Sequence, residues 1–410
     1  MSAAAAHDLK ITAIETVQLP QYQNILWLQL HTDAGLIGLG ETFRGADAVA
    51  TYLHTEGARI LLGANPLEID RISKLMLEPY IGFRSSGVEI RAASAIDIAL
   101  WDLFGKVTNL PVHQLLGGLS RPRIRTYNTC AGYSYNKSGR QRAVAAGTSE
   151  AAEGSYDDQI AFNRDAGALA ESLLSEGITA MKIWPFDPFA AANGGNFIHR
   201  SEIDTALRPF RQIRDAVGDK MEVMAELHSM WDLPSALAIA RALQEFRPFW
   251  AEDPLKMQDT DALASYARRS GLPVCASETL ATRASFIELL RKDAIDYVML
   301  DVSWCGGLSE ARKIAAIAEG FQRPVAPHDC TGPVVFAASI HLALNLPNAV
   351  FQESVRAYYS TWYRDLVTRM PRIEGGLIYP LEGPGLGTEL APDVLTRRDA
   401  VIRRTTAADL

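Results

Sequence analysis

The feature that most constrains this chain is a repeated alternation of short apolar runs and amphipathic helical runs between residues 123 and 354. Stretches such as PSALAIARALQEF and SEARKIAAIAEG carry apolar residues three and four positions apart, which is the spacing of a helix. Eight strands that alternate with helices predict a closed parallel β/α barrel rather than an open sheet. The eight apolar runs are RIRTYNTC (123–130), ITAMKIW (178–184), MEVMAE (221–226), PFWAED (248–253), PVCASE (273–278), DYVMLD (296–301), PVAPHD (324–329) and AVFQES (349–354).

The two ends of the chain do not follow this alternation. ITAIETVQL and NILWLQLHT predict two strands, and the glycine-punctuated DAGLIGLGE predicts a third, ahead of helical runs at 46–62 and 88–105. We therefore expect an N-terminal α+β unit over residues 1–122 and the barrel over residues 123–371. The Gly- and Pro-rich tail, residues 372–410, is expected to return and pack on the first unit.

Composition excludes several classes of protein. The chain has 410 residues, with 40 Lys and Arg against 48 Asp and Glu, and it lacks the cationic face of a nucleic-acid binder or anionic-membrane protein. Its four cysteines form no CxxC pair, which is typical of reduced thiols in the cytoplasm. The start, MSAAAAHDLK, does not resemble a signal peptide, and no apolar run is long enough for a transmembrane helix. We expect a cytoplasmic globular protein without nucleic-acid or membrane partners.

Two long segments, 131–160 and 185–203, follow the first and second predicted barrel strands. Loops at the carboxyl ends of barrel strands build the active site in this architecture. The second segment carries Phe186, Phe189, Phe197 and His199, and we interpret it as a lid.

Three glutamates stand at the last position of three consecutive apolar runs. Glu226, Glu252 and Glu278 are 26 residues apart both times. Strand–helix units of that length place equivalent positions side by side at one rim of a barrel. Three neighbouring carboxylates repel each other unless a cation holds them ionised. Their hard oxygen ligands predict Mg²⁺, with Mn²⁺ as an alternative.

Other polar residues continue this rim. Asp301 and Glu353 lie at or near the ends of later runs, His328 lies near the end of PVAPHD, and Lys182 lies in the second barrel strand. A carboxylate beside an imidazole orients the ring and raises its pKa, as a proton-transfer group requires, so we predict a catalytic Asp301–His328 pair. His228 follows Glu226 by two residues and is expected on the same side of its strand.

Together these segments resemble the enolase superfamily, and within it the mandelate racemase/muconate lactonizing enzyme branch. The resemblance covers nearly the whole chain. It implies a modified (β/α)7β barrel with an N-terminal capping domain, three metal-binding glutamates, an Asp–His dyad, and Glu353 as the acid that hydrogen-bonds the substrate carboxylate. The matching segments are GLIGLGE, ALWDLFGK, LLGG, AELH, WAEDP, ASET, LDVSWCGG, APHD and FQES.

One departure from the family pattern bears on the reaction. Where the family often has Lys-x-Lys, this chain reads Lys182-Ile183-Trp184, and tryptophan cannot take a proton. Racemisation by the usual Lys and His on opposite faces is therefore not predicted, and Lys182 is expected to bind either the substrate carboxylate or the metal-bound oxygen as a cation. The Glu226-x-His228 pattern looks like the Asp-x-His of galactonate-type dehydratases, in which two histidines divide the acid and base roles.

These observations predict an enzyme that removes the proton α to the carboxylate of a sugar acid, forms an enediolate and then expels water. Metal ions and hydrogen-bond donors stabilise the charge that develops in such a reaction. An epimerase or a cycloisomerase acting through the same enediolate is the alternative, and a non-catalytic scaffold with a decayed site is the alternative from another class. Trp184 and Arg84, which lies in the loop EPYIGFRSSG, are predicted substrate contacts. By resemblance we expect a homo-oligomer.

Overall fold

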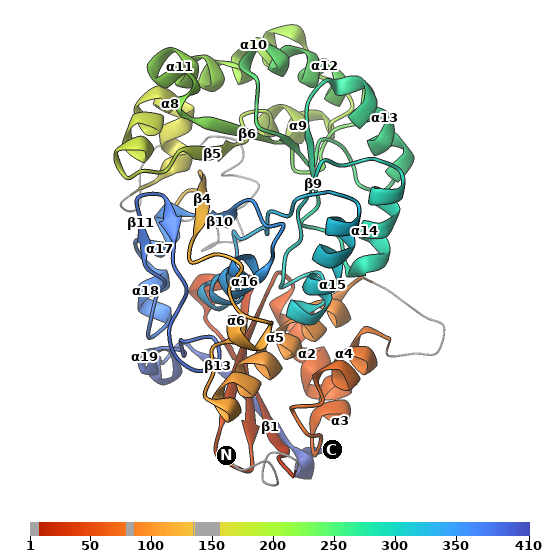
Figure 1. The fold of residues 1–410 in the computed structure, drawn as a ribbon, viewed down its shortest axis with the longest axis vertical. Helices are drawn as coiled ribbons and strands as arrows, with labels where there is room; N and C mark the ends of the chain where they lie inside the picture. The colour runs from red at the N-terminus through yellow and green to blue at the C-terminus, as the bar shows by residue number, and fades with distance from the viewer. Residues whose placement is uncertain (1–7, 79–85, 134, 136–155) are drawn as a thin grey trace.

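The computed structural model describes residues 8–78, 86–133, 135 and 156–410. Its barrel and its N-terminal unit lie at opposite ends of the molecule, with the C-terminus at the far end of the N-terminal unit (Figure 1). The predicted α/β barrel with an N-terminal α+β unit is confirmed. The helices of the N-terminal unit are α2 Ala46–Tyr52, η2 Leu53–Gly57, α3 Ala58–Leu61, α4 Ile69–Leu77, α5 Val88–Thr108 and α6 Val112–Leu115.

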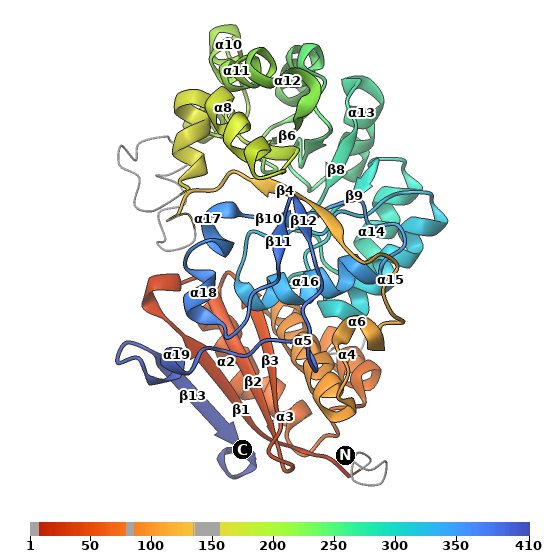
Figure 2. The same cartoon turned by 60° about the vertical axis from the view of Figure 1, so that its left-hand side comes forward.

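The N-terminal unit is built on a four-stranded antiparallel sheet. Its strand order is β13-β1-β2-β3, with β1 Ile11–Gln18, β2 Ile25–Thr32, β3 Ile37–Phe43 and β13 Val401–Thr406. The last strand of the chain therefore lies along the edge of the first sheet, beside β1 (Figure 2). The tail also contacts the barrel, because β12 (Leu377–Ile378) pairs with both β11 (Ile373–Glu374) and the first barrel strand.

The barrel strands form a parallel ring that starts at β4 and returns to it. Consecutive strands pair from β4 to β9, and single bridges continue from Val298 to Val325 and from Val325 to Ala349, ahead of β10, which pairs with β4. The seventh position is thus held by bridges at Val325 alone. The strands are β4 Ile124–Thr129, β5 Ala180–Ile183, β6 Glu222–Glu226, β7 Ala251–Glu252, β8 Val274–Ala276, β9 Tyr297–Val298 and β10 Gln352–Ser354.

Helices follow each strand position up to the seventh and cover the outside of the ring (Figure 1). Their apolar faces pack on the strands in the main core of the molecule. The helices from the barrel to the end of the chain are α8 Asp158–Ser175, α9 Asp187–Asn193, α10 Arg200–Ala206, α11 Arg208–Val217, α12 Leu233–Leu243, α13 Thr260–Ser270, α14 Thr282–Arg291, α15 Gly307–Gly320, α16 Pro333–Asn345, α17 Arg356–Tyr359, α18 Tyr363–Leu366 and α19 Pro392–Thr396.

A buried layer of side chains fills the barrel interior. It contains one residue from each of the eight strand positions, and these residues form a cluster separate from the main core. Because side chains alternate along a strand, the residue two positions later points into the same interior, one layer nearer the carboxyl rim. The layer therefore forms the floor beneath the side chains at the carboxyl rim. Its members are Tyr127, Ala180, Met224, Trp250, Cys275, Met299, Ala326 and Phe351.

Buried carboxylates join the N-terminal unit to the barrel. Glu41 of β3 accepts hydrogen bonds from the backbone N–H of Val335 at 2.9 Å and of Val334 at 3.3 Å, in the first turn of α16. Asp97 of α5 accepts from the N–H of Ser309 at 2.9 Å, in the first turn of α15. Carboxylates at helix N-termini satisfy orphan N–H groups and complement the helix dipole. These contacts fix the N-terminal unit over the carboxyl rim of the barrel.

The close packing of α5 on β3 explains the glycines of GLIGLGE. A Cβ at Gly38 or Gly40 would overlap the backbone carbonyl oxygens of Ala99 and Ala95 on α5. Glycine is required where two backbones approach this closely.

Among the described residues, no helix combines the length and hydropathy needed to cross a bilayer.

Candidate active site

One cavity at the carboxyl rim of the barrel collects most of the predicted site residues. It is lined by barrel residues and by Phe43 and Arg44, the last residue of β3 and the residue after it, in the N-terminal unit. Its volume is about 40 Å³. The barrel residues that line it are Thr129, Tyr135, Lys182, Trp184, His228, Glu278, His328, Cys330 and Glu353.

The three predicted metal ligands lie together. Glu226, Glu252 and Glu278 each offer a carboxylate oxygen, and these oxygens all lie within 4.8 Å of one another. Glu226 and Glu252 are buried, whereas the Glu278 side chain is 18% exposed toward the cavity. Such a cluster of oxygens is a suitable donor set for a hard divalent cation.

The equal spacing of these glutamates does not correspond to equal register. Glu226 and Glu252 are paired residues at the ends of β6 and β7, but the register partner of Glu252 on β8 is Cys275, three residues before Glu278. Strand β8 ends at Ala276, and Glu278 lies in the turn that follows. The expectation that all three occupy equivalent strand positions is therefore wrong for Glu278, which reaches the cluster through the turn.

Lys182 lies among these carboxylates. Its Nζ is 3.2 Å from Glu226 Oε2 and 3.1 Å from Glu353 Oε1, and it also pairs with Glu252 Oε1. Burial lowers the pKa of Lys182, but the coulombic attraction of Glu252 and Glu353 outweighs it and raises the pKa well above the ordinary lysine value. Burial and the neighbouring Glu226 raise the pKa of Glu252. One ammonium group therefore does not neutralise the whole cluster.

His328 and Asp301 form the predicted pair. His328 Nδ1 lies 2.7 Å from Asp301 Oδ2, and its Nε2 lies 2.8 Å from Glu278 Oε2. The other oxygen of Asp301 accepts hydrogen bonds from Ser303 N at 2.7 Å and Ser303 Oγ at 2.6 Å. Burial lowers the pKa of His328, but Glu278 and Glu353 raise it well above its usual range. The ring is held in one orientation between two carboxylates.

His228 has its own carboxylate, which the sequence analysis did not predict. His228 Nδ1 lies 2.7 Å from Oδ2 of Asp187, the first residue of α9. Burial lowers the pKa of His228, but Asp187 and Glu226 outweigh it and raise the pKa to about 9. The segment interpreted as a lid thus contributes a buried acid to the site. The only sequence signal for Asp187 was its place just after the second barrel strand.

The route by which His228 reaches the cavity differs from the predicted one. Strand β6 ends at Glu226, and His228 has a left-handed backbone with φ of 50°, followed by Ser229 with φ of 55°. Strand alternation beyond Glu226 therefore does not apply. A left-handed conformation is uncommon for residues other than glycine and clusters at functional sites. Here it turns the imidazole toward Asp187.

Glu353 and Trp184 complete the walls. Glu353 accepts hydrogen bonds from the Thr129 hydroxyl and, at 2.8 Å, from the backbone N–H of Asp329. Burial raises the pKa of Glu353, but Lys182 and His328 lower it below the ordinary value. Trp184 lies edge-on to His228, with ring centroids 5.6 Å apart.

Arg84 lies outside the described residues. Arg44 and Tyr135 line the cavity without having been predicted, because one comes from the N-terminal unit and the other from the long segment after β4.

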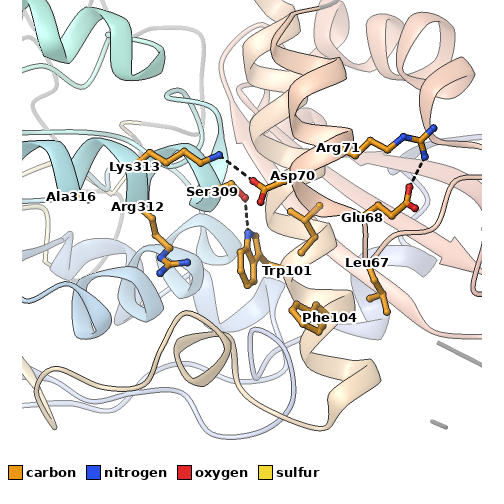
Figure 3. A pocket seen from close by; sticks show the side chains of 11 residues that line it. Leu67, Glu68, Asp70, Arg71, Trp101, Phe104, Ser309, Arg312, Lys313 and Ala316 are labelled. Carbon is orange, nitrogen blue, oxygen red and sulfur yellow. Dashed lines mark hydrogen bonds and ion pairs between the residues drawn. The ribbon is translucent and has the colours of Figure 1, made fainter. Parts of the chain in front are cut away.

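A larger cleft lies elsewhere, between α4 and α5 of the N-terminal unit and α15 of the barrel (Figure 3). Its volume is about 550 Å³. Its polar groups pair with one another: Lys313 Nζ lies 3.1 Å from Asp70 Oδ1, and Trp101 Nε1 donates to Ser309 Oγ at 2.9 Å. None of the residues predicted for the site lines this cleft, and we assign it to the domain interface.

Comparison with known proteins identifies relatives over nearly the full length. The chain is 29% identical to a D-galactonate dehydratase from Cronobacter sakazakii, with 95% of this chain and 94% of that protein covered. It is 28% identical to a D-xylonate dehydratase from Haloferax volcanii, with 95% and 88% covered. A crystal structure of an enolase of the mandelate racemase subgroup from Agrobacterium tumefaciens is 49% identical, with a TM-score of 0.86 and with 98% of this chain and 100% of that chain covered.

Two family matches divide the chain as the fold does. Residues 4–117 match the mandelate racemase/muconate lactonizing enzyme N-terminal domain. Residues 165–394, which include the three glutamates and both histidine–aspartate pairs, match the enolase C-terminal domain-like family. The chain belongs to the mandelate racemase/muconate lactonizing enzyme branch of the enolase superfamily.

Proposed function

We propose that the protein is a Mg²⁺-dependent dehydratase of sugar acids, which removes the proton α to the substrate carboxylate and then expels a β-hydroxyl as water. The observation that carries this proposal is the meeting of three carboxylate ligands and two histidine–aspartate pairs around one cavity. The names of the galactonate and xylonate dehydratase relatives support a sugar acid as the substrate class.

The charges of the site support a divalent cation. Six carboxylates, those of Asp187, Glu226, Glu252, Glu278, Asp301 and Glu353, surround one lysine and two histidines. With all six ionised and both imidazoles protonated, six negative charges would face three positive ones, and buried excess charge is costly. Glu226, Glu252 and Glu278 would hold Mg²⁺ or Mn²⁺. When bound, the ion would supply the positive charge that stabilises the substrate carboxylate as the α-proton leaves.

The two histidines would transfer protons on two sides of a substrate. His228 follows the third strand of the ring and His328 the seventh, and these positions are opposite in a ring of eight. Each ring is held through Nδ1 by an aspartate. Nε2 of His328 pairs with Glu278 at 2.8 Å, and it would turn to the substrate once Glu278 binds the metal ion. Removal of the α-proton by one histidine and protonation of the leaving hydroxyl by the other is the geometry of an anti elimination. General acid–base groups contribute about 10²- to 10⁴-fold each.

Lys182 and Glu353 would bind the substrate carboxylate. The buried Lys182 ammonium group pairs with Glu226 and Glu252, and Glu353, beside it, would donate or accept the hydrogen bond that strengthens as the enediolate forms. Donors aimed at developing charge in a site that excludes water are worth more than in solution.

Epimerisation is the second candidate, and the same opposed histidines favour it. Lysine is absent from position 184, so the usual Lys and His arrangement is unavailable, but two histidines on opposite sides can remove and return a proton. Cycloisomerisation would use the same first step. The fate of the substrate decides among these reactions.

The test is a panel of sugar acids incubated with purified protein and Mg²⁺, with 2-keto acid measured as product. Dehydration is expected for at least one acid and should stop when a chelator removes the metal. The Glu252→Gln variant should behave as the chelated protein does. Turnover that persists in the chelator would refute the metal requirement. A pure change of configuration, without 2-keto acid, would replace the dehydratase by the epimerase, and a protein that neither turns over an acid nor binds Mg²⁺ would be a scaffold.

A further inference from the structure

Arg44 brings positive charge to the cavity from the N-terminal unit. It directly follows β3, is exposed, and lines the same cavity as Lys182, His228 and His328. Every other residue with a formal charge on that lining comes from the barrel. Arg44 therefore marks the end of the cavity that faces the N-terminal unit.

The guanidinium of Arg44 lies near two aromatic rings, and its backbone is anchored to a neighbouring loop. Its Cζ lies 5.9 Å from the centroid of Phe43 and 6.0 Å from that of Trp304, and its backbone N–H donates to Asn24 O at 2.7 Å. Trp304 is itself held by a hydrogen bond from its Nε1 to Phe43 O at 3.1 Å. Arginine stacked on aromatic rings loses less freedom when it binds an anion.

The hydrogen-bonding capacity of this arginine is not used within the described part of the chain. Lys182 has three carboxylate partners, whereas no acidic side chain of the described residues lies within ion-pair distance of Arg44. A second guanidinium, that of Arg91, lies 4.7 Å from the other ring of this group, Trp304, and its buried Nε has no hydrogen-bond partner among the described residues. Both guanidinium groups lie at the Trp304 ring and neither forms an ion pair with a described carboxylate, so they leave donors for an anion.

We propose that the substrate is a sugar dicarboxylate, whose second carboxylate binds Arg44 while the first lies at the three glutamates. This inference rests on the proposed dehydratase function and narrows its substrate class from sugar acids to sugar diacids. A carboxylate matches the planar fork of arginine in two parallel hydrogen bonds, which a hydroxyl cannot do. A monoacid of the same configuration would leave Arg44 without its partner.

The experiment compares monoacids and diacids of matched configuration, such as D-galactonate with galactarate and D-gluconate with glucarate. Binding to the Mg²⁺-loaded protein is measured by calorimetry, and 2-keto acid formation is measured separately. The variants are Arg44→Gln, Arg44→Lys and, as a matched control, Arg312→Gln, an exposed arginine of α15 in the distant cleft of Figure 3. Thermal unfolding checks that each variant is folded.

The wild-type protein should prefer one of the diacids. Arg44→Gln should weaken the binding of that diacid about 10- to 100-fold, seen chiefly as a higher Kd and KM, because a charge-assisted hydrogen bond is lost. Arg44→Lys should retain part of the affinity for the diacid. The affinity of Arg44→Gln for the monoacid should differ from that of the wild type by less than about threefold, and Arg312→Gln should change the affinity for neither acid.

Equal or better binding of the monoacid, or an equal loss for both acids in Arg44→Gln, would overturn the inference. If monoacids then give 2-keto acid, the dehydratase proposal stands alone. Diacid binding that depends on Arg44, without dehydration of any acid, would keep this inference and overturn the dehydratase.

Discussion

Replacing Asp301 with asparagine tests one histidine–aspartate pair, because the structure determines which way the new amide must point. One oxygen of Asp301 accepts from the Ser303 backbone N–H at 2.7 Å, and that N–H can only donate. In the Asp301→Asn variant the amide oxygen must therefore stay on Ser303, and the amide NH2 must face His328 Nδ1. His328 Nδ1 then has to accept, so the ring proton moves to Nε2, which can no longer take a proton from a substrate.

The expected loss follows from the role of the imidazole. A general acid–base group contributes about 10²- to 10⁴-fold, or about 3–5 kcal/mol of barrier. The substitution keeps the shape of the side chain and its bond to Ser303, so the free energy of unfolding should change by about 1 kcal/mol. We expect kcat to fall in that range, while thermal unfolding and Mg²⁺ affinity stay near those of the wild type.

The assay measures kcat/KM by 2-keto acid formation, with exchange of the α-proton in D₂O followed by NMR. Asp97→Asn is the matched control, because Asp97 is also a buried aspartate that accepts a backbone N–H, but at the start of α15 and away from the cavity. That variant should lose stability and keep kcat within about threefold. If Asp301→Asn kept more than a tenth of wild-type kcat, the tautomer argument would be wrong.

Four further predictions follow from single contacts. Glu252→Gln should weaken Mg²⁺ binding and turnover together, as measured by titration and rate, and unchanged metal affinity would remove Glu252 from the metal site. The Asp187→Asn variant should lose about tenfold in kcat, less than Asp301→Asn. The second oxygen of Asp187 has no partner among the described residues, so the new amide can rotate and keep its oxygen on His228. A loss of kcat as large as that of Asp301→Asn would contradict this. Because position 184 holds Trp184, which cannot take a proton, a change of α-configuration would need both histidines; substrate recovered from D₂O with the His228→Asn variant should therefore keep its α-configuration by NMR, and labelled material of both configurations would refute this. Burial lowers the pKa of His341 from 6.5 to about 3, so the unfolded chain binds more protons than the folded protein below pH 6.5. The free energy of unfolding should therefore fall by about 2 kcal/mol between pH 6.5 and pH 5. In urea unfolding, the His341→Gln variant should show a smaller fall, and an equal fall would exclude His341 as the cause.

The alternation of side chains along a strand determined much of the rim from the sequence alone. Met224 and Glu226, Met299 and Asp301, and likewise Ala326 and His328, are pairs two residues apart, with the first member in the barrel floor and the second at the rim. This periodicity is a local property of extended backbone, so it does not depend on what the strand packs against. The barrel prediction and the grouping of these side chains follow from it, whereas their catalytic roles remain predictions.

The remaining parts of the site depend on contacts between distant segments. Glu278 joins the cluster from a turn after β8, and Asp187 meets His228 across 41 residues because α9 folds over the rim. Arg44 reaches the cavity only because Glu41 and Asp97 dock the N-terminal unit on α16 and α15. Turn geometry and domain docking are set by the packing of the whole chain, and no short-range pattern encodes them. The sequence by itself therefore determined the barrel and the strand-borne carboxylates, while the tertiary structure decided which loop residues complete the site.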